Sequence, residues 1–256
     1  IYTTHSVGCL PEDLGTGVKL VSPVEDVEER STIKKHFWSV DQRPGVVPLL
    51  FGMGASQLSF MAVRQSVFVE GATDMLLLPT LFRQATKREH LGFQIVPGIA
   101  MTSNANFGLL ENHAPRVAFL VDRDRDGEKY IKQLKKSGIE ENRIYQLPEW
   151  NQALVLEDYV RKELYLEAVN NQIKQWNNNT ENDLMSVENI PDSNRPQAVE
   201  NWCKDPNRNL KTPEKVSVTY ELLDLATGER QEKLIGDSLQ DKLSKLYESI
   251  IMTFSK

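Results

Sequence analysis

The chain has 256 residues, of which 40% are hydrophobic and 26% charged, a balance typical of a globular protein with one large domain or two modest ones. Its net charge of −6 excludes nucleic-acid binding by bulk positive charge alone, so such binding needs a local basic surface or bound cations. No apolar run is long enough to cross a bilayer, and Cys9 and Cys203 form neither a disulfide framework nor a zinc-binding spacing. We therefore expect a cytoplasmic protein with no membrane partner.

The first 64 residues show little regular pattern. Residues 1–6 (IYTTHS) are typical of a strand end followed by a polar turn, and the missing initiator methionine leads us to expect a piece of a longer chain. Residues 17–22 predict a short strand, and the charge-rich residues 25–35 predict a solvated segment. Residues 46–63 predict a helix that its glycines weaken.

Residues 66–147 alternate between apolar strands and amphipathic helices. Short continuous apolar runs predict four buried strands, at residues 66–69, 93–96, 117–121 and 143–147. The segments between them predict helices at residues 74–85, 106–112 and 127–137. Strands and helices that alternate at this spacing predict an α/β fold with a parallel, Rossmann-like sheet.

The last third of the chain has a different, mainly helical pattern. Three helices are predicted, at residues 159–176, 215–225 and 239–254. Between the first two, residues 177–196 are rich in Asn, Asp, Ser and Pro and predict a linker or a long loop. The chain therefore divides into three predicted parts, residues 1–64, an α/β core of residues 65–158 and a mainly helical region of residues 159–256.

Acidic residues stand where two of the predicted strands end. Glu70 directly follows the first strand and Asp122 the third, while Asp74 lies four residues after Glu70. Asp124 and Asp126 alternate with arginines just beyond the third strand. Because ligands bind at the carboxyl ends of parallel strands, these oxygen ligands are expected to meet at a site for Mg²⁺ or Mn²⁺. Each acid alone is more often a helix cap than a ligand, so the prediction depends on the whole group.

Two other sites that use similar acidic patterns explain the sequence less well. The string DRDRDG (residues 122–127) is similar to the first half of a calcium-binding EF-hand loop, but Gln133 stands where that loop needs a glutamate. A phosphatase of the haloacid-dehalogenase type also has an Asp-x-Asp after a strand, but it does not account for Glu70-Gly71 on the earlier strand. A shared metal site accounts for both groups of acids.

Two segments, VFVEGATD (residues 67–74) and FLVDRDRDG (residues 119–127), resemble the signature motifs of the TOPRIM domain. That domain occurs in topoisomerases, DnaG-type primases, RecR-like repair proteins and nucleases of the OLD family, named for overcoming lysogenization defect. The resemblance covers about residues 66–159. It implies that Glu70, Asp122 and Asp124 act as metal ligands or acid–base groups.

Two more segments narrow the resemblance to the OLD family. ALVLEDYV (residues 153–160) resembles the segment that supplies a further acidic ligand, here Glu157, with Asp158 as the less favoured choice. IYTTHS resembles the segment with the switch histidine of ABC-type ATPases, which implies that His5 contacts the γ-phosphate of ATP in the full-length protein. The simpler interpretation of His5 is an ordinary surface histidine.

The resemblance implies a nuclease that cuts DNA with two Mg²⁺ or Mn²⁺ ions. The implied metal ligands are Glu70, Asp74, Asp122, Asp124 and Glu157. The family also uses a lysine at the head of a later helix, which implies Lys215 as the third catalytic residue beside Glu70 and Asp122, with Lys211 as its rival. Arg123 and Arg125, next to the aspartates, are candidates for contact with the DNA backbone.

The expected partners are DNA and a second copy of the protein, joined through the ATPase part. One alternative is a fragment of a TOPRIM primase or topoisomerase. The other is a RecR-like TOPRIM module that binds DNA or partners without cutting. Roles in phage defence or DNA repair follow by analogy alone, and the choice between DNA and RNA stays open.

Overall fold

The computed structural model describes residues 11–23, 30–34, 65–99, 117–178 and 183–255. His5 and the helices predicted at residues 46–63 and 106–112 lie outside these ranges. The described residues form an α/β structure, and nearly all of their buried apolar side chains belong to one hydrophobic core.

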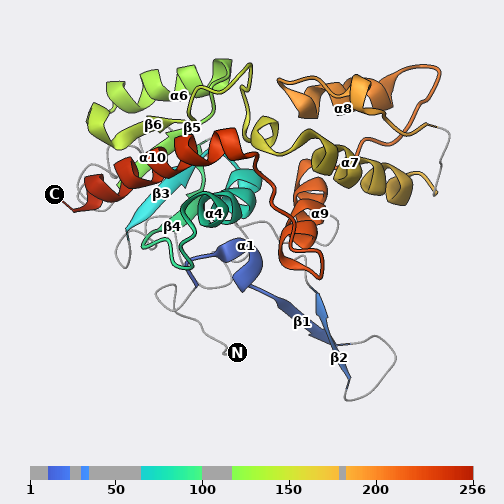
Figure 1. Cartoon of the computed structure of the whole chain (residues 1–256), viewed down its shortest axis with the longest axis horizontal. Helices are drawn as coiled ribbons and strands as arrows, with labels where there is room; N and C mark the ends of the chain where they lie inside the picture. Colours follow the sequence, from blue (N-terminus) through green and yellow to red (C-terminus); the bar gives the residue numbers. More distant parts are fainter. Residues whose placement is uncertain (1–10, 24–29, 35–64, 100–116, 179–182, 256) are drawn as a thin grey trace.

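Four parallel strands form the central sheet (Figure 1). Their order across the sheet is β4 (Gln94–Pro97), β3 (Ser66–Val69), β5 (Val117–Val121) and β6 (Ile144–Gln146). Val67 of β3 is aligned with Ile95 on one side and Ala118 on the other. All residues of β3, β4 and β5 are buried, which explains why continuous apolar runs mark these strands in the sequence. The predicted parallel α/β sheet is confirmed.

The chain leaves the two middle strands in opposite directions. Along the chain, helix α4 (Ala72–Thr86) connects β3 to the edge strand β4. Helix α6 (Arg125–Lys136) connects β5 to the other edge strand, β6. Because crossovers between parallel strands are right-handed, the two helices cover opposite faces of the sheet. The strand order therefore reverses between β3 and β5, and open α/β sheets bind ligands at the carboxyl ends of strands at such a point.

Four helices form the last third of the chain. They are α7 (Lys162–Trp176), α8 (Arg195–Lys204), α9 (Lys215–Thr227) and α10 (Asp237–Phe254). Figure 1 shows α7, α8 and α9 gathered to one side of the sheet, while α10 runs back across α4. Tyr247 of α10 packs against Phe82 and Phe93, with ring centroids 5.8 and 5.6 Å away, so α10 is part of the α/β core. None of the helices described here combines the length and the apolar character needed to span a bilayer.

The stretch predicted as a linker or a long loop, residues 177–196, contains no α-helix before residue 195 in its described part. Within the described part of that stretch, Met185 and Ile190 are buried, and a short 3₁₀ helix, η7 (Val187–Asn189), precedes α8. The last two residues of the stretch, Arg195 and Pro196, already belong to α8. The sequence analysis did not predict α8, and the polar composition of the stretch concealed the burial of Met185 and Ile190.

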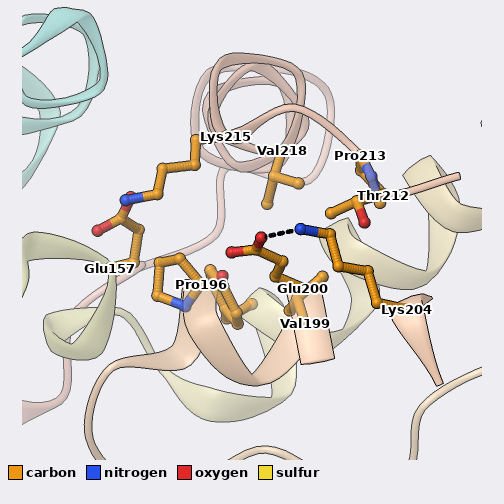
Figure 2. A pocket seen from close by; sticks show the side chains of 10 residues that line it. Glu157, Pro196, Val199, Glu200, Lys204, Thr212, Pro213, Lys215 and Val218 are labelled. Carbon is orange, nitrogen blue, oxygen red and sulfur yellow. Dashed lines mark hydrogen bonds and ion pairs between the residues drawn. The ribbon is translucent and has the colours of Figure 1, made fainter. Parts of the chain in front are cut away.

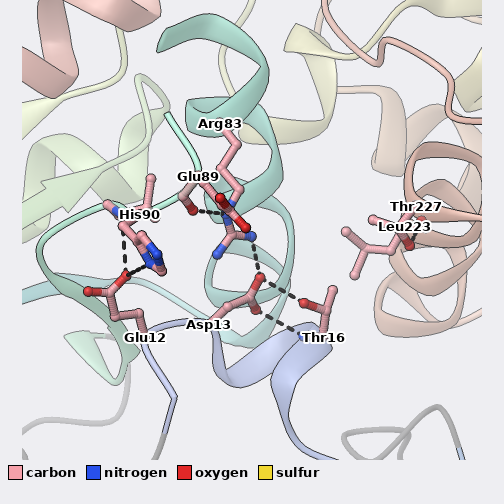
Figure 3. Close-up of polar contacts among 9 residues, drawn as sticks. Glu12, Asp13, Thr16, Arg83, Glu89, His90, Leu223 and Thr227 are labelled. Atoms are coloured by element: carbon pink, nitrogen blue, oxygen red, sulfur yellow. Dashed lines mark hydrogen bonds and ion pairs between the residues drawn. The ribbon is translucent and has the colours of Figure 1, made fainter. Parts of the chain in front are cut away.

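The described N-terminal residues are attached to α4 through the short helix α1 (Leu14–Gly17). Asp13 caps α1 by accepting a hydrogen bond from the amide of Thr16 at 2.9 Å, and it pairs with Arg83 of α4 at 2.6 Å (Figure 3). Beyond α1, strands β1 (Leu20–Pro23) and β2 (Ser31–Lys34) form an antiparallel hairpin. Strand β2 falls in a stretch expected to be merely solvated, and its residues 31–33 are exposed.

Candidate functional site

Carboxylates from four places in the chain meet at the carboxyl ends of β3 and β5. Glu70 follows β3, Asp74 lies in the first turn of α4, Asp122 follows β5, and Glu157 lies in a 3₁₀ helix, η6 (Leu156–Tyr159). Asp74 and Glu157 are buried, with exposed fractions of 8% and 6%, and Glu70 and Asp122 are half-buried. The amide of Asp122 donates a hydrogen bond to Oε1 of Glu70 at 2.9 Å, which joins the ends of the two strands. We call these four residues the carboxylate cluster.

Burial and mutual repulsion raise the pKa values of the cluster. Burial raises the pKa of Glu70 to about 7, although the hydrogen bond from the Asp122 amide opposes the change. Burial and then the charge of Glu157 raise the pKa of Asp74. Burial, followed by the charges of Asp74 and Glu157, raises the pKa of Asp122 well above its usual value. Such a cluster is stabilised by whatever brings positive charge to it, either protons or cations.

The donor atoms of the cluster fit a hard divalent cation. Oε1 of Glu157 is buried and accepts no hydrogen bond, and a void of about 10 Å³ is bordered by both Asp74 and Asp122. As the side chains stand, no three acidic, histidine or cysteine side chains of the described residues are grouped tightly enough to hold one ion. An ion held by three or more of these carboxylates would therefore require their side chains to move.

Asp124, next to the cluster, is the N-cap residue of α6. Its Oδ1 accepts a hydrogen bond from the amide of Gly127 at 2.8 Å and so caps α6. A Cβ atom on Gly127 would lie 2.1 Å from the carbonyl oxygen of Asp122, so only glycine fits this turn. The capping explanation therefore applies to Asp124, whose charge also raises the pKa of Glu70. Its role as a metal ligand stays a prediction.

Asp158, the less favoured candidate for the further ligand, accepts hydrogen bonds from backbone amides. It has no exposed surface. Its oxygens accept hydrogen bonds from the amides of Leu154 at 2.9 Å, Val155 at 3.2 Å, Asn194 at 2.8 Å and Arg195 at 3.0 Å. Asp158 therefore joins η6 to the start of α8, and Glu157 is the residue of this pair that lies in the cluster.

Arg195 holds the backbone around Glu157 from the other side. Its guanidinium is buried and donates hydrogen bonds to the carbonyl groups of Glu157 at 3.2 Å and Val160 at 2.6 Å. A third hydrogen bond reaches the carbonyl of Pro191 at 3.2 Å. Sequence reasoning missed this residue, because an arginine in a polar stretch looks the same whether it is buried or solvated.

Asp158→Asn is expected to lower the free energy of unfolding by about 2–4 kcal/mol, since the new amide group faces backbone donors and leaves them unsatisfied. Urea denaturation measures this change. The matched control is Asp192→Asn, whose carboxylate is 68% exposed and whose loss should change stability by less than about 0.5 kcal/mol. Equal stabilities of the two variants would contradict the structural role of Asp158.

Of the two candidate lysines, the structure brings Lys215 to the cluster. Lys215 is the first residue of α9, and Figure 2 shows its side chain extending toward Glu157. Its positive charge lowers the pKa of Glu157, against the larger effect of burial. Lys211 lies elsewhere, with its ammonium group 4.0 Å from the ring centroid of Trp176.

The two arginines beside the cluster differ in position. Arg123 is half-buried, its amide donates to the carbonyl of Leu154 at 2.7 Å, and its side chain lies 4.0 Å from the carboxylate of Glu149. Arg125 is exposed in the first turn of α6 and borders a groove along that helix, together with Lys129 and further basic residues. Arg125 is therefore the more accessible of the two.

No protein-family model matches this chain, and searches of curated proteins and of solved structures give no match either. The structure by itself defines an α/β protein with a four-stranded parallel sheet, consistent with a Rossmann-like fold. The carboxylate cluster and Lys215 lie together at the reversal point of that sheet.

Proposed function

We propose that this chain is the TOPRIM nuclease part of an OLD-type ATP-dependent nuclease and that it cuts DNA phosphodiester bonds with two Mg²⁺ or Mn²⁺ ions. The observation that carries the proposal is the meeting of Glu70, Asp74, Asp122 and Glu157 at the reversal point of the sheet, with Lys215 beside them. The TOPRIM-like motifs in the sequence supply the expected order of these acids along the chain.

The ions would be held by the four members of the cluster and by Asp124. When bound, they would supply a hydroxide from a metal-bound water and neutralise charge on the scissile phosphate and the leaving oxygen. Glu70 lies at the end of β3, where its Oε1 accepts a hydrogen bond from the amide of Asp122, so it is placed to hold an ion or to act as a general base or acid. Lys215 adds a positive charge beside the cluster, where it would stabilise the extra negative charge of the transition state.

The surface of α6 supports a path for the DNA backbone. Its groove is bordered by basic side chains, Arg125, Lys129, Lys132 and Lys136, together with Asp126 and Gln133. This local positive charge offsets the net charge of −6 where a phosphate chain would leave the cluster. In the full-length protein, ATP bound at His5 and a dimer formed through the ATPase part would regulate cutting.

One observation favours the second candidate, a TOPRIM module that binds DNA or a partner without cutting. No three ligands in the described part of the chain are already grouped tightly enough for an ion. The buried charge of the cluster favours the nuclease instead, because a module that only binds has no need of carboxylates that raise one another's pKa.

A supercoiled-plasmid assay with Mg²⁺, Mn²⁺, Ca²⁺ or EDTA tests the proposal. We expect nicked and linear products with Mg²⁺ or Mn²⁺ and none with EDTA. Lys215→Met is expected to slow cutting by about 10²-fold or more, whereas Lys211→Met should leave the rate nearly unchanged, because only Lys215 lies beside the cluster. No cutting by the folded protein with any metal would support the binding module, and equal rates for the two variants would remove Lys215 from the mechanism.

A further inference from the structure

A cavity of about 200 Å³ lies between α8 and the start of α9 (Figure 2). Pro196 and Val199 form one wall, and Pro213 and Val218 form the wall across from it. In Figure 2, Glu200 and Lys204, which pair with each other, lie between these walls, and Thr212 lies beside Pro213 at the edge. Apolar walls with a few polar groups are typical of a pocket for a small organic ligand.

The same cavity borders the candidate catalytic site. One end is formed by Glu157, a member of the carboxylate cluster, and by Lys215. The buried Oε1 of Glu157, which accepts no hydrogen bond, therefore belongs to a residue that lines both the cavity and the cluster. A nucleotide whose phosphate lies at the cluster carries its base only one sugar away, and that base is within reach of the cavity.

The size of the cavity limits what it can hold. Its volume of about 200 Å³ is below the roughly 300–1,000 Å³ of typical small-molecule pockets, so it has room for one base but not for a base pair with its two sugars. The pocket could not be predicted from the sequence, since one wall belongs to α8, a helix that was not predicted, and the other lies around the start of α9.

We propose that this cavity is a nucleobase pocket, which takes the unpaired base beside the phosphate to be cut and so directs the enzyme to single-stranded or locally opened DNA. This inference rests on the proposed nuclease function and specifies its substrate. In a duplex, the base enters only after it has left its stack and its partner, which costs a few kcal/mol. Bases at gaps, frayed ends and single strands avoid that cost.

The first test measures binding without cutting. Isothermal titration calorimetry with Ca²⁺ compares deoxyadenosine monophosphate with deoxyribose 5-phosphate, which lacks the base. We expect the nucleotide to bind at least tenfold more tightly to the wild type. Val218→Phe, which fills the cavity from α9, should remove this preference, whereas Val187→Phe should keep it because Val187 is 45% exposed on η7, outside the cavity. Thr212→Leu, at the polar edge, replaces Val218→Phe if circular dichroism shows that variant to be unfolded.

The second test compares the cutting of one labelled oligonucleotide as a single strand and as a duplex. We expect the single strand to be cut at least tenfold faster by the wild type and by Val187→Phe, and this ratio to fall toward one in Val218→Phe. Equal binding of the nucleotide and the sugar phosphate by the wild type would overturn the pocket, even if plasmid is cut. A binding preference that Val218→Phe removes, in a protein that cuts no DNA, would support the pocket and overturn the nuclease.

Discussion

Asp122→Asn is expected to slow metal-dependent plasmid cutting by at least about 10³-fold while the protein stays folded. The side chain of Asp122 lies in the carboxylate cluster at the end of β5, and its charge is the part of the residue that asparagine removes. The contact with Glu70 is made by the backbone amide of Asp122, so it survives the substitution. Gel quantification of nicked and linear plasmid over time measures the rate.

The stability of this variant separates a lost ligand from a damaged fold. Removing one negative charge from a group whose members repel one another should leave the melting temperature in EDTA unchanged or higher. Asp241→Asn is the matched control, since Asp241 is exposed on α10, and it should cut at the wild-type rate. A wild-type cutting rate for Asp122→Asn would exclude Asp122 from catalysis.

In EDTA, the protein is expected to lose stability as the pH rises from about 4.5 to above 7. A carboxyl group whose pKa is higher in the folded state stabilises the fold below its unfolded pKa, and this contribution is lost as the pH rises through the folded pKa. For Glu70 the two values are 4.5 and about 7, a difference worth about 3 kcal/mol. The raised pKa values of Asp74 and Glu157 act in the same direction.

Divalent cations should reverse this loss, because they neutralise the cluster in place of protons. Melting temperatures between pH 5 and 8, with EDTA and with Mg²⁺ or Mn²⁺, measure the effect. Asp74→Asn should flatten the pH dependence of the melting temperature in EDTA, because it removes a carboxyl group whose pKa is raised in the folded protein. The fold should survive, since the amide oxygen of asparagine can still accept the hydrogen bond that Gly71 donates to Asp74 at 2.9 Å. A melting temperature in EDTA that does not change between pH 5 and 8 would contradict the electrostatics of the cluster.

The sequence by itself determined the parallel α/β core and the places of its acids. The runs at residues 66–69 and 117–121 become β3 and β5 with the predicted bounds. The strand predicted at 93–96 lies one residue later, at 94–97, and the strand predicted at 143–147 is one residue shorter at each end. This succeeded because a strand buried on both faces carries a local signal, an unbroken apolar run. The positions of Glu70 and Asp122 followed from the same signal, since the carboxyl ends of neighbouring parallel strands meet.

Only the tertiary structure decided which neighbouring residues face the cluster. Glu157 and Asp158 are adjacent and chemically alike, but one is turned to the cluster and the other to the amides of residues 154, 155, 194 and 195. Arg195, 38 residues from the carbonyl group that it binds, holds that arrangement. The choice between Lys215 and Lys211 was decided in the same way. Lys215 begins α9 and extends toward Glu157, whereas the ammonium group of Lys211 lies over the ring of Trp176. Side-chain direction here depends on contacts between segments far apart in the chain, and no local pattern encodes such contacts.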